Sequence, residues 1–173
     1  MTGISAHCAA ATRKMAAIPV GLAFATLVAL AGCAPPPPPP PTIVNAQVTA
    51  AADVNATPDG RGAPLAVRVY QLGGKAGFEG AEFFRLYNAD AATLGPDLIK
   101  KEEFVLTPGG SKTLALTPTD PVKAIAVFGA YREFQTVVWR ATADVAPNKT
   151  INLAVTADKA GIKIVVTPAK PAS

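Results

Sequence analysis

Histidine and cysteine are nearly absent from this 173-residue chain, which contains one histidine, His7, and two cysteines, Cys8 and Cys33. His7 and Cys8 precede an apolar run, Ile18–Ala31, and the basic pair Arg13-Lys14 lies just before that run. A basic segment, an apolar segment and small residues in this order are typical of a secretory signal peptide, which is removed on export. We therefore expect a mature chain that starts at Cys33, contains no histidine and has a single cysteine.

These absences exclude several classes of chemistry. Without histidine, neither a Ser-His-Asp triad nor a Cys-His pair can form, and no zinc or iron site can be built on histidine or paired thiolates. A single cysteine cannot form a disulfide within the chain, so packing of an apolar core must hold the fold together. Glu102 and Glu103 are adjacent and point to opposite faces of a strand. Asp53 and Asp59 lack the ligand spacing of an EF-hand. We expect no catalytic residues, no cofactor and no metal site.

Strong charge and long apolar runs are also missing. The chain has 16 basic and 12 acidic residues, and loss of residues 1–32 removes Arg13 and Lys14, which leaves 14 against 12. No cluster of lysine and arginine with interleaved aromatic residues occurs, so we expect no nucleic-acid partner. The apolar run Ile18–Ala31 is shorter than the roughly 20 residues that a membrane-spanning helix needs.

The residues around Cys33 carry the clearest signal in the chain. Leu30-Ala31-Gly32-Cys33 resembles the bacterial lipobox, in which the cysteine is acylated and becomes the first residue of the mature protein. The alternative is an ordinary signal peptide in which Cys33 stands by chance. A single acyl chain anchors a protein only marginally, whereas a triacylated cysteine holds it stably at a membrane. Because Ala34, and not an aspartate, follows the cysteine, the usual sorting rule predicts the outer membrane.

Seven consecutive prolines, Pro35–Pro41, follow this cysteine. A polyproline II segment rises about 3.1 Å per residue and is stiff, so seven prolines span roughly 20 Å. We interpret residues 33–41 as a lipidated cysteine followed by a spacer between the membrane and a folded domain. The alternative is a ligand for a proline-recognising domain.

Beyond the prolines the dominant period is two, which indicates strands with one buried face. Alternation is clear in five segments: 44–49, 65–70, 114–116, 151–156 and 162–167. Phe104–Leu106 and Thr136–Thr142 are interpreted as further strands, and Ala124–Ala130 is apolar on both faces. Turn residues separate these segments, and Pro108-Gly109-Gly110 is typical of a tight hairpin. We predict an antiparallel β-sandwich over residues 42–168 and a tail over 169–173.

One segment departs from this alternation. From Phe78 to Tyr87 the apolar residues are spaced as in a helix, with Glu79, Glu82 and Arg85 on the other side. We predict an amphipathic helix here that covers the outer face of a sheet. Such a helix would explain why the strand at 124–130 is apolar on both faces.

An ordered set of features resembles a known family. It consists of the lipobox cysteine, Val67-Arg68-Val69-Tyr70-Gln71-Leu72, Phe78…Phe83-Phe84, Leu94-Gly95-Pro96-Asp97-Leu98, Leu106-Thr107-Pro108-Gly109, Ala130-Tyr131-Arg132 and Trp139-Arg140. Together these features resemble the outer-membrane lipoprotein of the type VI secretion system, the TssJ (SciN/VasD) family. The resemblance runs from Cys33 to about Val166. The proline tract is not part of the family pattern.

The resemblance implies a fold and a function. The fold is an all-β sandwich of two four-stranded sheets with a transthyretin-like topology and a short helical insertion. The function is that of a lipid-anchored outer-membrane component of the secretion system's membrane complex, facing the periplasm. Its partner is the periplasmic C-terminal region of the inner-membrane protein TssM. A transthyretin-like carrier of a small ligand and a peptidoglycan-associated lipoprotein are the alternatives, and an enzyme comes third.

The resemblance also points to the loop between the first two strands as a partner contact. Here this loop covers residues 53–64, and by composition alone it is a solvated, turn-rich loop. Within it we expect contacts from Asp53, Asn55, Asp59, Gly60 and Arg61, because polar side chains at a loop tip can reach a partner.

A further pair of motifs, Tyr131-Arg132 and Trp139-Arg140, invites a binding-site interpretation, because Tyr, Trp and Arg dominate interface hot spots. Trp139 fits a core residue better, because large aromatic side chains are usually buried in a sandwich. The sequence leaves the roles of Arg132 and Arg140 open.

Overall fold

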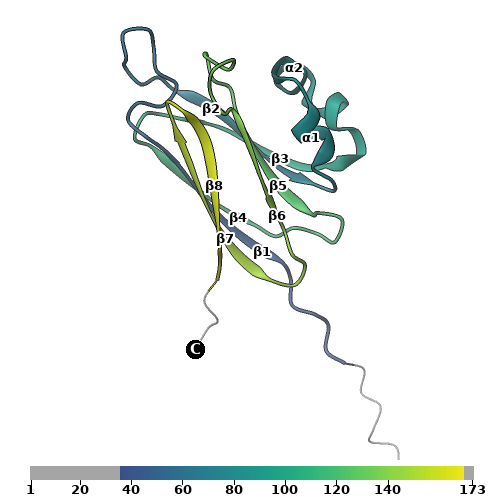
Figure 1. The fold of residues 1–173 in the computed structure, drawn as a ribbon. Coiled ribbons are helices and arrows are strands. Elements are labelled where there is room, and N and C mark those ends of the chain that lie inside the picture. The colour runs from purple at the N-terminus through teal and green to yellow at the C-terminus, as the bar shows by residue number, and fades with distance from the viewer. Residues whose placement is uncertain (1–35, 170–173) are drawn as a thin grey trace, which may run out of the picture. The chain divides into compact units, whose positions relative to one another are not determined.

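The computed structural model describes residues 36–169, and both sheets belong to the compact unit that starts at Pro39. Eight strands form two four-stranded sheets, with the orders β4-β1-β7-β8 and β3-β2-β5-β6 (Figure 1). The elements in chain order are β1 (Ile43–Ala50), β2 (Leu65–Leu72), α1 (Ala76–Gly80), α2 (Phe83–Leu94), the short 3₁₀ helix η2 (Gly95–Asp97), β3 (Leu98–Leu106), β4 (Ser111–Leu116), β5 (Ala124–Gly129), β6 (Arg140–Asp144), β7 (Thr150–Asp158) and β8 (Gly161–Pro168). The predicted all-β sandwich of two four-stranded sheets with a helical insertion is confirmed.

The main core lies between the two sheets and follows from the period-two pattern. In β7, Ile151, Leu153 and Val155 are buried while the residues between them are exposed. Val67 and Val69 of β2, which belongs to the other sheet, are also buried and are part of the same apolar cluster. Because alternate side chains of a strand point to the same face, the period-two pattern places these residues in the layer between the two sheets. The predicted inward faces of both strands are confirmed.

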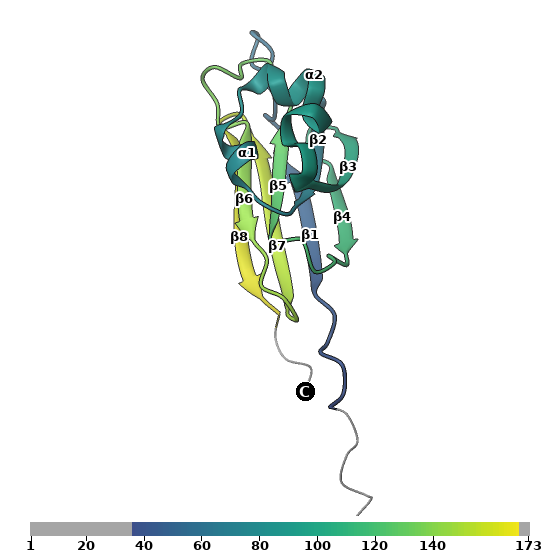
Figure 2. The ribbon, with the colours of Figure 1, turned by 90° about the vertical axis from the view of Figure 1, so that its right-hand side faces the viewer.

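A second core lies on the outer face of the β3-β2-β5-β6 sheet. All six residues of β5 are buried, because α1 and α2 cover its outer side (Figure 2). The buried residues of this cluster are Tyr70, Leu72, Phe78, Phe83, Leu86, Leu94, Ala126 and Phe128. The predicted pairing of a helical insertion with a doubly apolar strand is confirmed.

The insertion differs in detail from the single helix predicted over 78–87. It consists of two helices, and the backbone is extended at Ala81 and Glu82 between them. α1 ends at Gly80, a residue whose flexibility disfavours helix continuation. α2 then runs on to Leu94 with a non-helical residue at Ala89.

The aromatic side chains of this insertion are not all buried. Phe83 is buried, whereas Phe84 and Tyr87 are 56% and 45% exposed. Because α2 starts anew at Phe83, this start determines which face of α2 points to the sheet. The spacing of the apolar residues did not predict the break at Ala81 and Glu82.

The strands differ from the prediction in three ways. Pro108-Gly109-Gly110 is not a hairpin, because it connects β3 in one sheet to β4 in the other. The sandwich is not fully antiparallel, because β1 and β7 pair in parallel. The strand predicted over 136–142 begins as β6 only at Arg140, after an isolated bridge at Val138.

Among residues 36–169, no helix is long and apolar enough to cross a membrane. The predicted signal peptide 1–32 and Cys33 lie outside the described residues.

Candidate partner-binding site

The predicted contact loop lies at one end of the sandwich, opposite the end where β1 begins. It joins the last residue of β1, Ala50, to the first residue of β2, Leu65. The register places three more connections at the same end, those following β3, β5 and β7. We call this the loop end, and we call the opposite end, where Ile43 starts β1, the tether end (Figure 1).

Two backbone hydrogen bonds close the tip of the loop. The Thr57 N–H donates to the Arg61 carbonyl and the Gly60 N–H donates to the Thr57 carbonyl, each over 2.8 Å. Gly60 has a φ of +80°, a conformation that glycine adopts at no steric cost. Asp59, Gly60 and Arg61 are all exposed. The tip is therefore an ordered turn that presents two opposite charges to solvent.

Those two charges are paired with each other. The Nε of Arg61 donates to an Asp59 carboxylate oxygen at 2.6 Å, and the Thr57 hydroxyl donates to the other oxygen. The Thr57 and Arg61 hydrogen bonds lower the pKa of the Asp59 carboxyl below its ordinary value. Because both partners are exposed, this pair contributes little to stability and mainly orients the tip.

Asn55 lies elsewhere than the sequence led us to expect. It is buried, not at the loop tip, and its backbone has a left-handed φ of 48°. Its Nδ2 donates to the Pro64 carbonyl at 2.8 Å and its Oδ1 accepts from the backbone N–H of Arg132 at 2.9 Å. Asn55 therefore links this loop to the β5–β6 connection. The expectation of a solvent-facing Asn55 was wrong because its amide satisfies backbone groups of two loops.

The base of the loop belongs to the main core. Val54 is fully buried and Ala63 is nearly so. Asp53 is partly exposed and pairs with Lys159 of the β7–β8 turn at 3.7 Å. The five predicted residues thus fall into two groups, with Asp59, Gly60 and Arg61 at the tip and Asp53 and Asn55 at the base.

The residues of the motifs Tyr131-Arg132 and Trp139-Arg140 also differ in their roles. Trp139 is half-buried and packs against both cores. The guanidinium of Arg140 lies 4.5 Å from the centre of the Trp139 ring and donates to the carbonyls of Phe78 and Ala81. Arg140 therefore holds the end of α1 and has a structural role, whereas the Arg132 side chain is exposed at the loop end.

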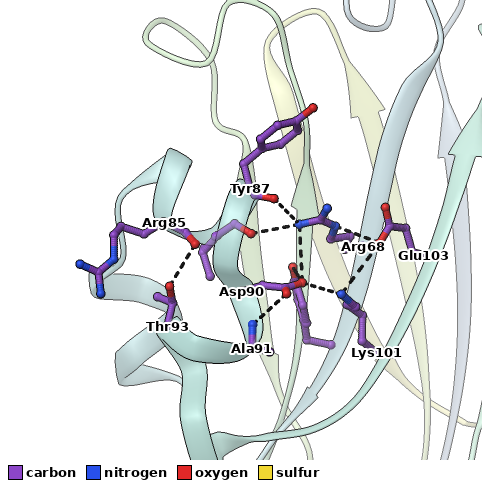
Figure 3. A network of polar contacts seen from close by, with 10 residues as sticks. Arg68, Arg85, Tyr87, Asp90, Ala91, Thr93, Lys101 and Glu103 are labelled. Carbon is purple, nitrogen blue, oxygen red and sulfur yellow. Dashed lines mark hydrogen bonds and ion pairs between the residues drawn. The ribbon is translucent and has the colours of Figure 1, made fainter.

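A polar network that the sequence did not reveal joins α2 to the sheet (Figure 3). The Nη1 of Arg68 donates to the Leu86 and Tyr87 carbonyls, each over 3.0 Å. It also lies 3.5 Å from the Asp90 carboxylate. These two carbonyls come just before the irregular turn at Ala89, so the β2 arginine satisfies acceptors that the interrupted helix leaves free.

Asp90 is the centre of this network. Its carboxylate accepts from the Lys101 ammonium at 2.8 Å and from the Tyr70 hydroxyl at 3.0 Å. Burial favours a higher pKa for the Asp90 carboxyl, but hydrogen bonds from Lys101, Tyr70 and the Ala91 N–H outweigh it and lower the pKa. The network contains the Glu103 carboxylate, which pairs with Arg68 at 3.1 Å. The network has a structural role, because Arg68, Tyr70 and Lys101 of the sheet all bind groups of α2.

Within residues 36–169, no cluster of three or more acidic, cysteine or histidine side chains is arranged to bind a metal ion.

Comparisons with known proteins agree with this architecture. Residues 42–160 match the family described as "Type VI secretion lipoprotein, VasD, EvfM, TssJ, VC_A0113". A search of curated proteins gave no significant match.

Solved structures share the fold. TssJ1, a type VI secretion lipoprotein from Pseudomonas aeruginosa, is 34% identical over 76% of this chain and 100% of its own, with a TM-score of 0.73. Lip, a membrane-bound type VI secretion component from Serratia marcescens, is 25% identical over 71% of this chain and 96% of its own, with a TM-score of 0.65.

A third structure, described as the TssM C-terminal domain (869–1107) from EAEC, is 21% identical over 70% of this chain and 99% of the matched chain, with a TM-score of 0.60. At that identity the likeness concerns the fold. The family match and the 34% identity to TssJ1 together show that this chain belongs to the TssJ (VasD) family of type VI secretion lipoproteins.

Proposed function

We propose that this protein is the outer-membrane lipoprotein that holds the type VI membrane complex by binding the periplasmic C-terminal region of TssM through its loop end. The observation that carries the proposal is the placement of loop 53–64 at the end opposite Ile43, where the chain from the proline tract enters β1. The loop end is therefore the end of the sandwich opposite the point where the N-terminal segment joins β1.

The anchor in this proposal is acylated Cys33, in the inner leaflet of the outer membrane. The support is the lipobox-like Leu30-Ala31-Gly32-Cys33 and membership in a lipoprotein family. Pro35–Pro41 then acts as a stiff spacer of roughly 20 Å. This arrangement needs no cofactor and no small-molecule substrate.

In this proposal the tip and the base of loop 53–64 have different roles. Asp59, Gly60 and Arg61 are exposed and ordered, so they reach the partner with little loss of conformational entropy. Asp53 and Asn55 position the tip through Lys159 and the Arg132 backbone. The alternative of a transthyretin-like carrier gains no support between the sheets, where buried side chains of the main core fill the space.

A charge reversal at the tip tests this function. Arg61→Glu should slow association with the purified periplasmic domain of the cognate TssM by about threefold to tenfold, because a rim charge acts mainly on the association rate. The matched control is Lys149→Glu, which reverses an exposed charge in the turn at the tether end. Association and dissociation rates are measured by surface plasmon resonance with both proteins folded by circular dichroism.

A second variant removes the tip and keeps the base. Replacing Pro58–Arg61 by Gly-Ser should abolish binding while the melting midpoint changes little, because these residues are exposed and Val54 and Ala63 stay in place. Undiminished binding by this variant would move the contact away from the tip. An equal defect in Lys149→Glu would contradict the assignment of the loop end.

A further inference from the structure

A cluster of partly exposed aromatic side chains lies where α2 meets the β5–β6 connection. We call it the aromatic patch, and it consists of Phe84, Tyr87, Phe134 and Trp139 around the buried Phe83. Phe84 is 56% exposed and Tyr87 is 45% exposed, whereas Phe134 and Trp139 are half-buried. Single apolar residues at a protein surface are common, but apolar side chains that adjoin one another there mark an interaction site.

The aromatic patch is held in place by contacts among its own rings. The Phe83 ring stacks on Phe134 with centroids 4.4 Å apart and meets Trp139 edge-on at 5.3 Å. Phe84 packs edge-on against Phe134 at 5.0 Å. Phe83 also packs on Phe128 of β5 at 5.2 Å, so the patch is attached to the sheet. Exposed rings that are already ordered lose little conformational entropy when a partner binds.

A hollow of about 400 Å³, open to solvent, lies beside these rings. Phe84, Phe134 and Trp139 are among its lining residues, and its charged groups are the Glu82 carboxylate and the Arg140 guanidinium. The guanidinium already donates to two backbone carbonyls of the helical insertion. One group of each sign gives the hollow no net charge, so an uncharged, apolar side chain fits it best.

The aromatic patch is continuous with the loop end. Asn55 of loop 53–64 accepts a hydrogen bond from the backbone N–H of Arg132 at 2.9 Å, and Phe134 follows two residues later in the same connection. Figures 1 and 2 both show α2 and the β5–β6 connection toward the end of the sandwich that contains this loop. A partner seated on loop 53–64 can therefore extend onto the aromatic patch.

We infer that TssM also binds the aromatic patch, by inserting a large apolar side chain into the hollow beside Phe84 and Trp139. This inference rests on the proposed function and adds an apolar anchor to a contact that the tip of loop 53–64 makes through polar groups. Aromatic residues that line a pocket are typical of the few side chains that carry most of the binding energy of an interface, whereas exposed charges at its rim contribute less.

Two other occupants suit an apolar surface. A lipid surface is the poorer one, because the patch lies at the loop end, opposite the point where the N-terminal segment joins β1. The other is a second copy of this chain, and the experiment below separates it from TssM.

Phe84→Ala tests the patch, because it removes the most exposed ring. With the full-length chain, the affinity for the purified periplasmic domain of the cognate TssM should fall by about tenfold or more, as for a hot-spot side chain. Because Phe84 is more than half exposed, the melting midpoint should fall by only a few degrees. The matched control is Val165→Ala, since Val165 is 60% exposed on β8 in the other sheet, and its binding should be unchanged.

Trp139 reports on the hollow without any substitution of Phe84, because it is the only tryptophan in the sequence. Fluorotryptophan incorporated at this position gives the chain a single fluorine NMR signal. Addition of the unlabelled TssM domain should shift this signal, because an apolar side chain then lies against the lining of the hollow. The signal should not depend on the concentration of the chain when TssM is absent.

Unchanged affinity of Phe84→Ala, or an equal loss in Val165→Ala, would overturn the inference and leave the proposed function standing. A fluorine signal that stays in place while surface plasmon resonance shows binding would do the same. A signal that moves with the concentration of the chain alone would make the patch an interface between copies of this chain, and the inference would be wrong. Absence of any binding by the unsubstituted chain would overturn the proposed function and this inference with it.

Discussion

At the scale of single residues, polar side chains at the loop end serve two different purposes. Asp59 and Arg61 are exposed and pair with each other, so their removal leaves no buried group without a partner. Asn55 is buried, and each end of its amide satisfies a backbone group of a different loop segment. Burial and hydrogen bonding, more than polarity, therefore decide which of these residues the fold needs.

Asn55→Ala should be strongly destabilising. The substitution leaves the Pro64 carbonyl and the Arg132 N–H without their partner and places alanine at a positive φ, so we expect a loss of about 2–4 kcal/mol in the free energy of unfolding. Urea unfolding measures this loss. Asp59→Ala, at the exposed tip, should change the same quantity by less than about 0.5 kcal/mol. Similar losses in the two variants would mean that Asn55 does not link the two loops.

Asp90 makes stability depend on pH. Its pKa is lowered in the folded state, so the carboxylate stabilises the fold above its unfolded pKa of about 3.9, and this stabilisation is lost as the pH falls through the folded pKa. We expect the free energy of unfolding to fall below about pH 4. In Asp90→Asn this part of the decrease should be absent, with lower stability at pH 7. Denaturant unfolding from pH 7 to pH 2.5 measures both. Parallel pH profiles for the two proteins would rule out this contribution.

At the scale of elements, the sandwich has two apolar layers where a plain sandwich has one. β5 contributes Ile125 and Val127 to the main core and Ala126 and Phe128 to the layer under α1 and α2. Arg68 of β2, in the same sheet, donates hydrogen bonds to two backbone carbonyls of α2. The helical insertion is therefore part of the folded core and not an appended surface feature.

The inward face of β7 gives the element-scale prediction. Leu153 is 1% exposed in the main core, so Leu153→Ala should reduce the free energy of unfolding by about 2–5 kcal/mol. Asn152 is exposed on the other face, and Asn152→Ala should cost less than about 0.5 kcal/mol. Thermal or urea unfolding of the two variants compares them directly. Equal effects would mean that the strand faces are assigned the wrong way round.

At the scale of the whole molecule, the topology separates two ends with different surroundings. The tether end contains the start of β1 and the turn at Asn148, whose N–H donates to the Thr42 hydroxyl. The loop end gathers loop 53–64, the β5–β6 connection and the β7–β8 turn. The proposed partner contact therefore lies at the end of the sandwich opposite the start of β1, as the proposed function requires.

Cys33→Ala tests the anchor. The variant should lose outer-membrane association and be recovered in soluble form or with its signal peptide still attached, because the residue proposed to be acylated is missing. Cell fractionation followed by immunodetection of the protein measures its distribution. Recovery in the outer membrane at the level of the unsubstituted protein would contradict the lipoprotein assignment.

Local sequence patterns alone predicted much of the secondary structure of this protein. The alternation in 44–49 and 151–156 and the apolar run at 124–130 depend only on neighbours in the chain, and each predicted its strand correctly. The helical spacing after Phe78 predicted a helical insertion but not its division into α1 and α2. The absence of histidine after His7 likewise limits the chemistry available to the folded domain. Such features can be read from sequence because strand and helix periods are local properties of the backbone.

Only the tertiary structure decided how these elements combine. The parallel pairing of β1 with β7 joins residues more than 100 positions apart, and the turn at Pro108–Gly110 crosses between sheets although its residues suit a hairpin. Asn55 is buried because its amide meets the backbone of Arg132, 77 residues away. Partners of this kind are set by packing across the whole fold, which a local period does not encode.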